Sequence, residues 1–238
     1  MEMMRWLIGV ILVTVVLFIL MVPTPRVRSS SVGGANAQRE QEGKRVYTND
    51  DFPSGTGPAP AASDDSPQPV AGEPGEKVAP YVPTPMEIVD KMLELAGVTS
   101  KDVVYDLGSG DGRIVLRAAE LYGAKAVGVE IDHGLVRESL DKAKEMKLDK
   151  LVTIIEGDLF KTDLKPATVV TIYLLLSTND RLRPILEKDL RPGTRIVAHD
   201  IRIPGWEPSV EREVTLGVGI HYIYLYHVPN AFRKPAPG

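Results

Sequence analysis

Between residues 103 and 113, an apolar run is followed by three glycines at alternate positions. Gly108, Gly110 and Gly112 let the backbone approach a ligand where any Cβ would collide. An apolar strand, a glycine-rich turn and a helix in succession are typical of a nucleotide-binding loop. A dinucleotide-binding loop also requires a third glycine where this chain has Arg113, so the sequence indicates a different nucleotide-type ligand.

Two acids, Asp106 and Asp111, flank this turn. They would repel a pyrophosphate, whereas they suit a cofactor whose nearby end carries an ammonium and a sulfonium group, as S-adenosylmethionine does. An acid that ends an apolar strand is costly to bury without a partner, so we predict that Asp106 contacts the cofactor. Asp111 is expected to shape the loop or cap the helix, with Arg113 paired to a neighbouring acid.

Two later apolar runs also end in polar residues. The first ends in Glu130 and Ile131, about twenty residues past the loop, where an acid can accept hydrogen bonds from both ribose hydroxyls. The second covers residues 152–156 and leads to Asp158 and Leu159. A carboxylate and an apolar side chain there predict contacts with the exocyclic amine and the ring of an adenine.

Candidate residues for the chemical step follow the fourth and fifth apolar runs. Tyr173 is predicted to line the active site beside the reactive methyl group, with a buried aromatic role as the alternative. Asn179 is predicted either to contact substrate or to cap the next helix. His199 and Asp200 end the fifth run, where they could accept a proton, hold substrate backbone or form a structural polar pair.

A short segment precedes the first predicted helix, which extends from Pro85 to Gly97 with Thr84 as its cap. Tyr81 and Thr84 are predicted to fold over the cofactor as a lid, with plain packing as the alternative. Further helices are predicted at 112–122, 134–147 and 178–190. Their alternation with five apolar strands predicts a parallel, doubly wound α/β sheet.

The motif from Asp106 to Gly112 resembles that of class I S-adenosylmethionine-dependent methyltransferases. Over roughly residues 80–206 the chain is similar to a narrower, membrane-tethered family, which includes the mitochondrial lysine methyltransferases of the adenine nucleotide translocase and of the ATP synthase c-subunit, together with bacterial relatives. The segments that carry this similarity are Tyr81–Pro85, Asp106–Val115, Gly157–Phe160, Leu182–Pro184 and Pro192–Asp200.

The resemblance implies a Rossmann-like, seven-stranded sheet with strand order 3-2-1-4-5-7-6. The hairpin predicted from residues 209 to 227 would supply its antiparallel strand. It also implies methylation of a protein lysine, with S-adenosyl-L-methionine as cofactor. Relatives often have a proline after Tyr-Leu-Leu, where this chain has Leu176, so the family's substrate contacts near Tyr173 are not carried over to this chain.

The chain has 238 residues, no cysteine and four histidines spread along the sequence. The absence of cysteine excludes disulfides, cysteine nucleophiles and thiolate metal sites. Scattered histidines disfavour a metal centre, so we predict no metal. Charge is balanced beyond residue 80, without a basic block that would follow a phosphate backbone, and nucleic acid is therefore not favoured as a substrate.

Composition divides the chain into an anchor or signal segment (1–22), a disordered linker rich in Pro, Gly, Ser and Ala (23–80), a methyltransferase domain (81–230) and a tail (231–238). Residues 6–22 carry no charge and are near the lower limit for spanning a bilayer core of about 30 Å. The small-residue site at 35–37 lies too far beyond them for ready cleavage. The positive charges that follow predict an uncleaved single-pass membrane anchor with a cytoplasmic domain; the alternative is export, with residues 1–37 removed.

The favoured function is therefore methylation of a lysine on a protein. Because residues 6–22 would hold this chain at a membrane, the target is expected to lie in or at that membrane. A small-molecule or lipid methyltransferase is one alternative, because it would share every cofactor residue. A non-catalytic S-adenosylmethionine-binding module is the other. The Asn/Asp-Pro-Pro-aromatic motif of enzymes that methylate the amino groups of bases is absent, since Tyr173–Leu176 stands in its place.

Overall fold

The computed structural model describes residues 45–47 and 81–232. The predicted anchor, nearly all of the predicted linker and the end of the tail lie outside these residues. Within the described part of the chain, no helix combines the length and the apolar character needed to cross a membrane.

One mixed sheet forms the centre of the described domain, with strand order β1-β4-β3-β2-β5-β6-β8-β7. Neighbouring strands from β4 to β6 are parallel, whereas β8 is antiparallel to both β6 and β7. Without β1, this is the predicted order 3-2-1-4-5-7-6, which is confirmed. The seven strands are β2 (Val103–Leu107), β3 (Lys125–Glu130), β4 (Val152–Glu156), β5 (Val169–Ile172), β6 (Arg195–His199), β7 (Val210–Leu216) and β8 (Gly219–His227).

The eighth strand, β1 (Arg45–Tyr47), was not predicted, because it lies within the segment assigned to the linker. It pairs antiparallel with β4, so that Arg45 is opposite Glu156 and Tyr47 is opposite Ile154. Three residues are too few to display the alternating pattern from which strands are predicted. The pairing depends instead on the edge of β4, which offers unpaired backbone groups.

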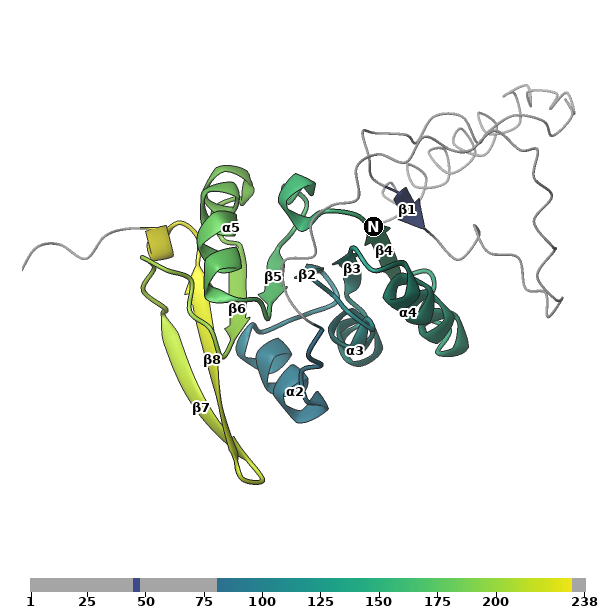
Figure 1. The fold of residues 1–238 in the computed structure, drawn as a ribbon, viewed down its shortest axis with the longest axis horizontal. Coiled ribbons are helices and arrows are strands. Elements are labelled where there is room, and N and C mark those ends of the chain that lie inside the picture. The colour runs from purple at the N-terminus through teal and green to yellow at the C-terminus, as the bar shows by residue number, and fades with distance from the viewer. Residues whose placement is uncertain (1–44, 48–80, 233–238) are drawn as a thin grey trace, which may run out of the picture. The chain divides into compact units, whose positions relative to one another are not determined.

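Helices cover both faces of the sheet (Figure 1). One core contains the apolar residues of α2, α3 and α4, and the other contains those of α5. Successive strand residues alternate between the two cores: Val104 belongs to the first and Tyr105 to the second, as expected for a sheet buried on both sides. The helices are α2 (Met86–Leu95), α3 (Arg113–Tyr122), α4 (His133–Glu145) and α5 (Leu176–Asp189), with short 3₁₀ helices at Leu159–Lys161 and Asn230–Phe232.

Two predicted helix starts are wrong. Helix α2 begins at Met86 after Pro85, and Thr84 does not cap it, because the Thr84 hydroxyl lies 3.3 Å from His199 Nδ1 instead. Helix α5 begins at Leu176, two residues earlier than predicted, without a side-chain cap. Asn179 therefore lies inside α5 and cannot cap it.

Candidate functional site

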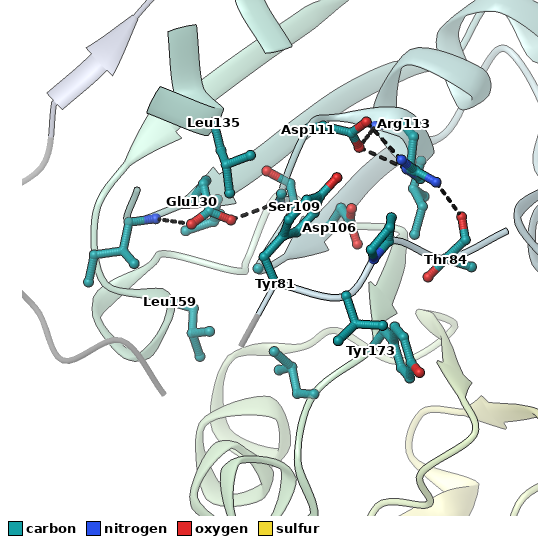
Figure 2. A pocket seen from close by; sticks show the side chains of 18 of the residues that line it. Tyr81, Thr84, Asp106, Ser109, Asp111, Arg113, Glu130, Leu135, Leu159 and Tyr173 are labelled. Carbon is teal, nitrogen blue, oxygen red and sulfur yellow. Dashed lines mark hydrogen bonds and ion pairs between the residues drawn. The ribbon is translucent and has the colours of Figure 1, made fainter. Parts of the chain in front are cut away.

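A pocket opens at the carboxyl ends of β2, β3, β4 and β5 (Figure 2). This is the edge at which open α/β sheets bind ligands. Every residue that was predicted to bind the cofactor lines the pocket, except Gly112. The lining includes Tyr81, Thr84, Asp106, Gly108, Gly110, Glu130, Ile131, Asp158, Leu159 and Tyr173.

The glycine-rich loop depends on backbone conformations that favour glycine. Gly108, Gly110 and Gly112 all have positive φ values, of 81°, 56° and 78°. A Cβ on Gly110 would lie 2.5 Å from the Tyr81 ring, so the absence of a side chain lets that ring pack on the loop. Gly112 is different, because its missing Cβ makes room for Ser139 of α4. It packs the start of α3 and does not line the pocket to which the sequence assigned it.

Glu130 ends β3 and joins it to the loop. One of its carboxylate oxygens accepts a hydrogen bond from the Gly110 N–H at 2.7 Å. The other accepts from the N–H groups of Ile131 and Asp132, at 2.8 and 2.9 Å. Three backbone donors hold this carboxylate in place, and it is buried at the wall of the pocket.

Asp106 is the penultimate residue of β2 and is almost fully buried. The Thr171 hydroxyl donates a hydrogen bond to its carboxyl group at 2.7 Å. Burial, opposed by this hydrogen bond and reinforced by the charge of Glu130, raises the pKa of Asp106 to about 7. A carboxyl group of this kind gains from a cationic ligand, which would replace some of the lost solvation.

Asp111 does not share this role, and its pairing with Arg113 is the one that the sequence predicted. Its carboxylate accepts hydrogen bonds from Arg113 Nε at 2.8 Å and from Lys142 Nζ at 2.8 Å. Burial opposes its ionisation, but these two cations outweigh burial and hold the pKa of Asp111 well below its usual range. Its charge is therefore neutralised within the protein, and the attraction for a cationic ligand comes from Asp106 and Glu130.

The predicted lid lies across the loop. The Arg113 guanidinium bridges the Asp111 carboxylate and the Thr84 carbonyl oxygen, to which it donates at 2.8 Å (Figure 2). Tyr81, three residues earlier, packs its ring against Gly110. Residues 81–84 are thus held at the pocket at both ends. Arg113 holds Thr84 through a hydrogen bond, and the ring of Tyr81 packs on Gly110.

At the opposite wall, Asp158 begins the short 3₁₀ helix. One of its carboxylate oxygens accepts from the Phe160 N–H at 2.9 Å, which is the turn contact that Gly-Asp sequences often make. Leu159 is buried beside it, and both residues line the pocket with Ile131. This wall combines apolar surface with a carboxylate, as the ring and amine of adenine require.

Of the three predicted catalytic residues, only Tyr173 lines the pocket. Its ring centroid lies 4.1 Å from that of His199. Asp200 lies behind this pair, where its Oδ2 is 3.2 Å from His199 Nε2. Asn179 is buried elsewhere and donates to the carbonyl oxygens of residues 201 and 202, so it holds the loop after β6.

His221 of β8 was missed by the sequence analysis. Its Nδ1 lies 3.0 Å from His199 Nε2 and 3.2 Å from Asp200 Oδ2. Burial lowers the pKa of His199, against the raising effect of Asp200, and thereby favours the neutral ring. No sequence signal places residue 221 here, because the contact depends on the register of the β6–β8 pair.

The chemistry of the lining fits S-adenosylmethionine. Glu130 would accept hydrogen bonds from the ribose hydroxyls, and Asp158 and Leu159 would hold the adenine. The Asp106 carboxyl group favours a positively charged part of the ligand beside it. The buried Ser109 hydroxyl, which has no partner among the described residues, also lines the pocket. Together the fold and this pocket define a class I S-adenosylmethionine-dependent methyltransferase.

Comparison with known proteins gives the narrower family. A family model described as the ANTKMT methyltransferase domain matches residues 106–210. A protein-lysine N-methyltransferase of Saccharolobus islandicus is 47% identical over 148 residues, which cover 62% of this chain and 92% of that protein. The adenine nucleotide translocase lysine N-methyltransferase of Mus musculus is 31% identical over 63% of this chain and 63% of that protein. The chain belongs to the methyltransferase family that contains the Saccharolobus islandicus protein.

A solved structure agrees on the fold and the cofactor. The crystal structure of an RNA methyltransferase from Salinibacter ruber in complex with S-adenosyl-L-homocysteine is 48% identical to this chain. It aligns with a TM-score of 0.58 over 65% of this chain and 100% of that one. S-adenosylmethionine is therefore the cofactor of the present protein.

Binding of S-adenosylmethionine is expected to tighten as pH rises towards about 7, and to level off above it. Below this pH, Asp106 is protonated in the free protein, because its pKa is raised to about 7. A bound cation favours the carboxylate, so binding releases a proton, and the affinity rises up to tenfold per pH unit. Calorimetric titration at several pH values, in two buffers of different ionisation enthalpy, measures both the affinity and the released proton.

The matched variant for this measurement is Asp106→Asn, which keeps the shape and the contact with Thr171 but cannot titrate. Its affinity is expected to be low and independent of pH over the same range. A wild-type affinity that does not change between about pH 5.5 and 7 would show that Asp106 is not linked to cofactor binding.

Proposed function

We propose that the protein transfers a methyl group from S-adenosylmethionine to the side-chain amine of a lysine in a protein. The observation that carries this proposal is the 47% identity to the archaeal protein-lysine N-methyltransferase, which extends over 92% of that protein. The composition of the pocket supports it, because apolar and aromatic groups form part of its lining. These are Tyr81, Val82, Tyr173 and Leu174.

Apolar surroundings suit a lysine substrate for a chemical reason. The amine has a pKa of about 10.4 in water and must be neutral to attack, and burial among apolar groups favours the neutral form. The sulfonium of the cofactor supplies an activated methyl group, so the protein has to position the amine, exclude water and accept a proton. Burial and the charge of Asp200 raise the pKa of Tyr173, which keeps its hydroxyl protonated. Tyr173 therefore serves to orient the amine.

The test uses the full-length protein, labelled S-adenosylmethionine, and separate membrane, soluble-protein and RNA fractions of its own source cells. Mass spectrometry of the labelled material is expected to find methyl-lysine in a defined protein, and none with Glu130→Ala. Label confined to lipids or small molecules would reject the proposal in favour of that class of substrate.

RNA is the second candidate acceptor, favoured by one observation. The Salinibacter ruber protein described as an RNA methyltransferase is 48% identical over its whole length. Against it, the domain has no basic block, and the whole chain carries a net charge of −4. Label in the RNA fraction of the same experiment would support this candidate and contradict the first.

We further propose that residues 6–22 anchor the protein in a membrane, with the domain on the cytoplasmic side, and that its target lies at that membrane. The support is the uncharged run and the positive charges that follow it. Alkaline extraction of membranes is expected to leave the protein in the pellet, and deletion of residues 1–22 to release it. A mature protein that begins near residue 38 would instead identify a cleaved signal peptide.

A further inference from the structure

Three side chains that could ligate a metal converge behind Tyr173. His199 and Asp200 stand at the end of β6, and His221 stands on the neighbouring strand β8. Their potential ligand atoms are His199 Nε2, Asp200 Oδ2 and His221 Nδ1. The three separations between these atoms are 3.0 Å for the two nitrogens and 3.2 Å from the oxygen to each nitrogen.

We propose that His199, Asp200 and His221 bind a divalent transition metal ion of the zinc type. Zinc lies about 2.0–2.2 Å from imidazole nitrogen and carboxylate oxygen. Ligand atoms at that distance are about 2.9 Å apart at adjacent octahedral positions and about 3.4 Å apart in a tetrahedron. The observed separations of 3.0–3.2 Å lie between these values, so one ion can contact all three atoms.

Hydrogen bonding among the three groups explains the arrangement less completely. Each imidazole nitrogen has one lone pair or one N–H in the plane of its ring, and an ionised carboxylate only accepts. Both rings could donate an N–H to Asp200 Oδ2, but the two donor nitrogens would then face each other at only 3.0 Å. A cation at the centre satisfies three lone pairs at once.

The groups around these ligands hold them in place. The Thr84 hydroxyl contacts His199 Nδ1 at 3.3 Å, and the Tyr222 N–H donates to Asp200 Oδ1 at 2.8 Å, which leaves Oδ2 for the metal. Such outer contacts orient the ligands of most metal sites. Asp200 also has a φ of 57°, a left-handed conformation that costs a residue other than glycine energy and that directs its carboxylate to the two rings.

The metal site adjoins the wall of the cofactor pocket. Tyr173 packs against the His199 ring, and Thr84 contacts its other nitrogen, while both residues line the pocket. A metal ion on His199 would therefore position Tyr173 and Thr84. Three protein ligands also leave at least one coordination position for water or another ligand.

The test measures metal binding without any methyl acceptor, so its outcome is independent of the proposed lysine substrate. Full-length protein, purified without a histidine tag and freed of metal with a chelator, is titrated with Zn²⁺ in a calorimeter. One equivalent is expected to bind with micromolar or tighter affinity. Co²⁺ is expected to give visible absorption bands typical of nitrogen and oxygen ligands.

The decisive variants are His221→Ala and Asp200→Asn, which should each weaken Zn²⁺ binding at least a hundredfold and remove the cobalt bands. His227→Ala is the matched control, because His227 lies on the same strand and contacts Ser209 outside the cluster. Thermal unfolding curves establish that the variants are folded. Absence of stoichiometric binding by the wild type, or equal binding by a folded His221→Ala, would overturn the proposal.

Discussion

Replacing Glu130 with alanine is expected to weaken the binding of S-adenosylmethionine at least a hundredfold. The carboxylate is placed to accept from two ribose hydroxyls, and a hydrogen bond to a charged group contributes about 1.5–3 kcal/mol. Two such bonds correspond to a factor of about a hundred or more in the dissociation constant. The variant also loses the bond to the Gly110 N–H, which holds the loop against the end of β3. Calorimetric titration measures the change.

The matched control is Glu156→Ala. Glu156 is the register partner of Glu130 on the adjacent strand β4, at the same edge of the sheet. Its carboxylate contacts His133 Nδ1 at 2.9 Å and does not line the pocket, so its removal is expected to leave the affinity within about threefold of the wild type, roughly the effect of losing one surface contact. Similar affinities for the two variants would contradict the assignment of Glu130 to the ribose.

Gly112→Ala is expected to lower the free energy of unfolding by about 2–5 kcal/mol. The left-handed conformation, with φ of 78°, costs alanine about 1–2 kcal/mol. The new Cβ would also lie 2.8 Å from Ser139 Oγ and 2.9 Å from Ser139 Cβ, and crowding in a packed interior costs about 1–3 kcal/mol. Ser139 is fully buried and donates to the Gly110 carbonyl oxygen, so its displacement is expected to disturb the loop and weaken cofactor binding too.

Gly217→Ala separates the two contributions. Gly217 has a similar φ of 60° in the β7–β8 turn, but a Cβ there meets nothing within 4 Å. The free energy of unfolding of Gly217→Ala is expected to fall only by the cost of the left-handed conformation, about 1–2 kcal/mol, with cofactor binding unchanged. Equilibrium unfolding in urea compares the two variants. If Gly112→Ala lost no more stability than Gly217→Ala, the close packing of the loop against α4 would not contribute to the free energy of unfolding.

The cofactor pocket could be predicted because its residues follow a local rule. Asp106, Glu130 and Asp158 each stand at or just beyond the end of an apolar strand, and the carboxyl ends of parallel strands meet at one edge of the sheet. The neutralisation of Asp111 does not follow from this local rule. Its charge is neutralised partly by Lys142, which lies 31 residues further along on α4, and only the packing of α3 and α4 brings the two together.

The contacts made by Thr84 and Asn179 could also be identified only from the structure. A Thr-Pro pair before an amphipathic run predicts a helix cap, but the Thr84 hydroxyl contacts His199, which lies 115 residues away in sequence. Asn179 near a helix start suggests a cap as well, yet α5 begins earlier and buries it. In both cases a tertiary contact replaced the local hydrogen bond that the sequence predicted.

The sequence by itself determined the fold class and the cofactor, because the spacing of glycines and acids around the strand ends is a local property of the chain. Only the tertiary structure decided which polar groups surround Tyr173. His199 and His221 are 22 residues apart, and their meeting depends on the antiparallel register of β6 and β8. Such a register is set by long-range packing of the hairpin on the sheet, which no spacing along the chain encodes.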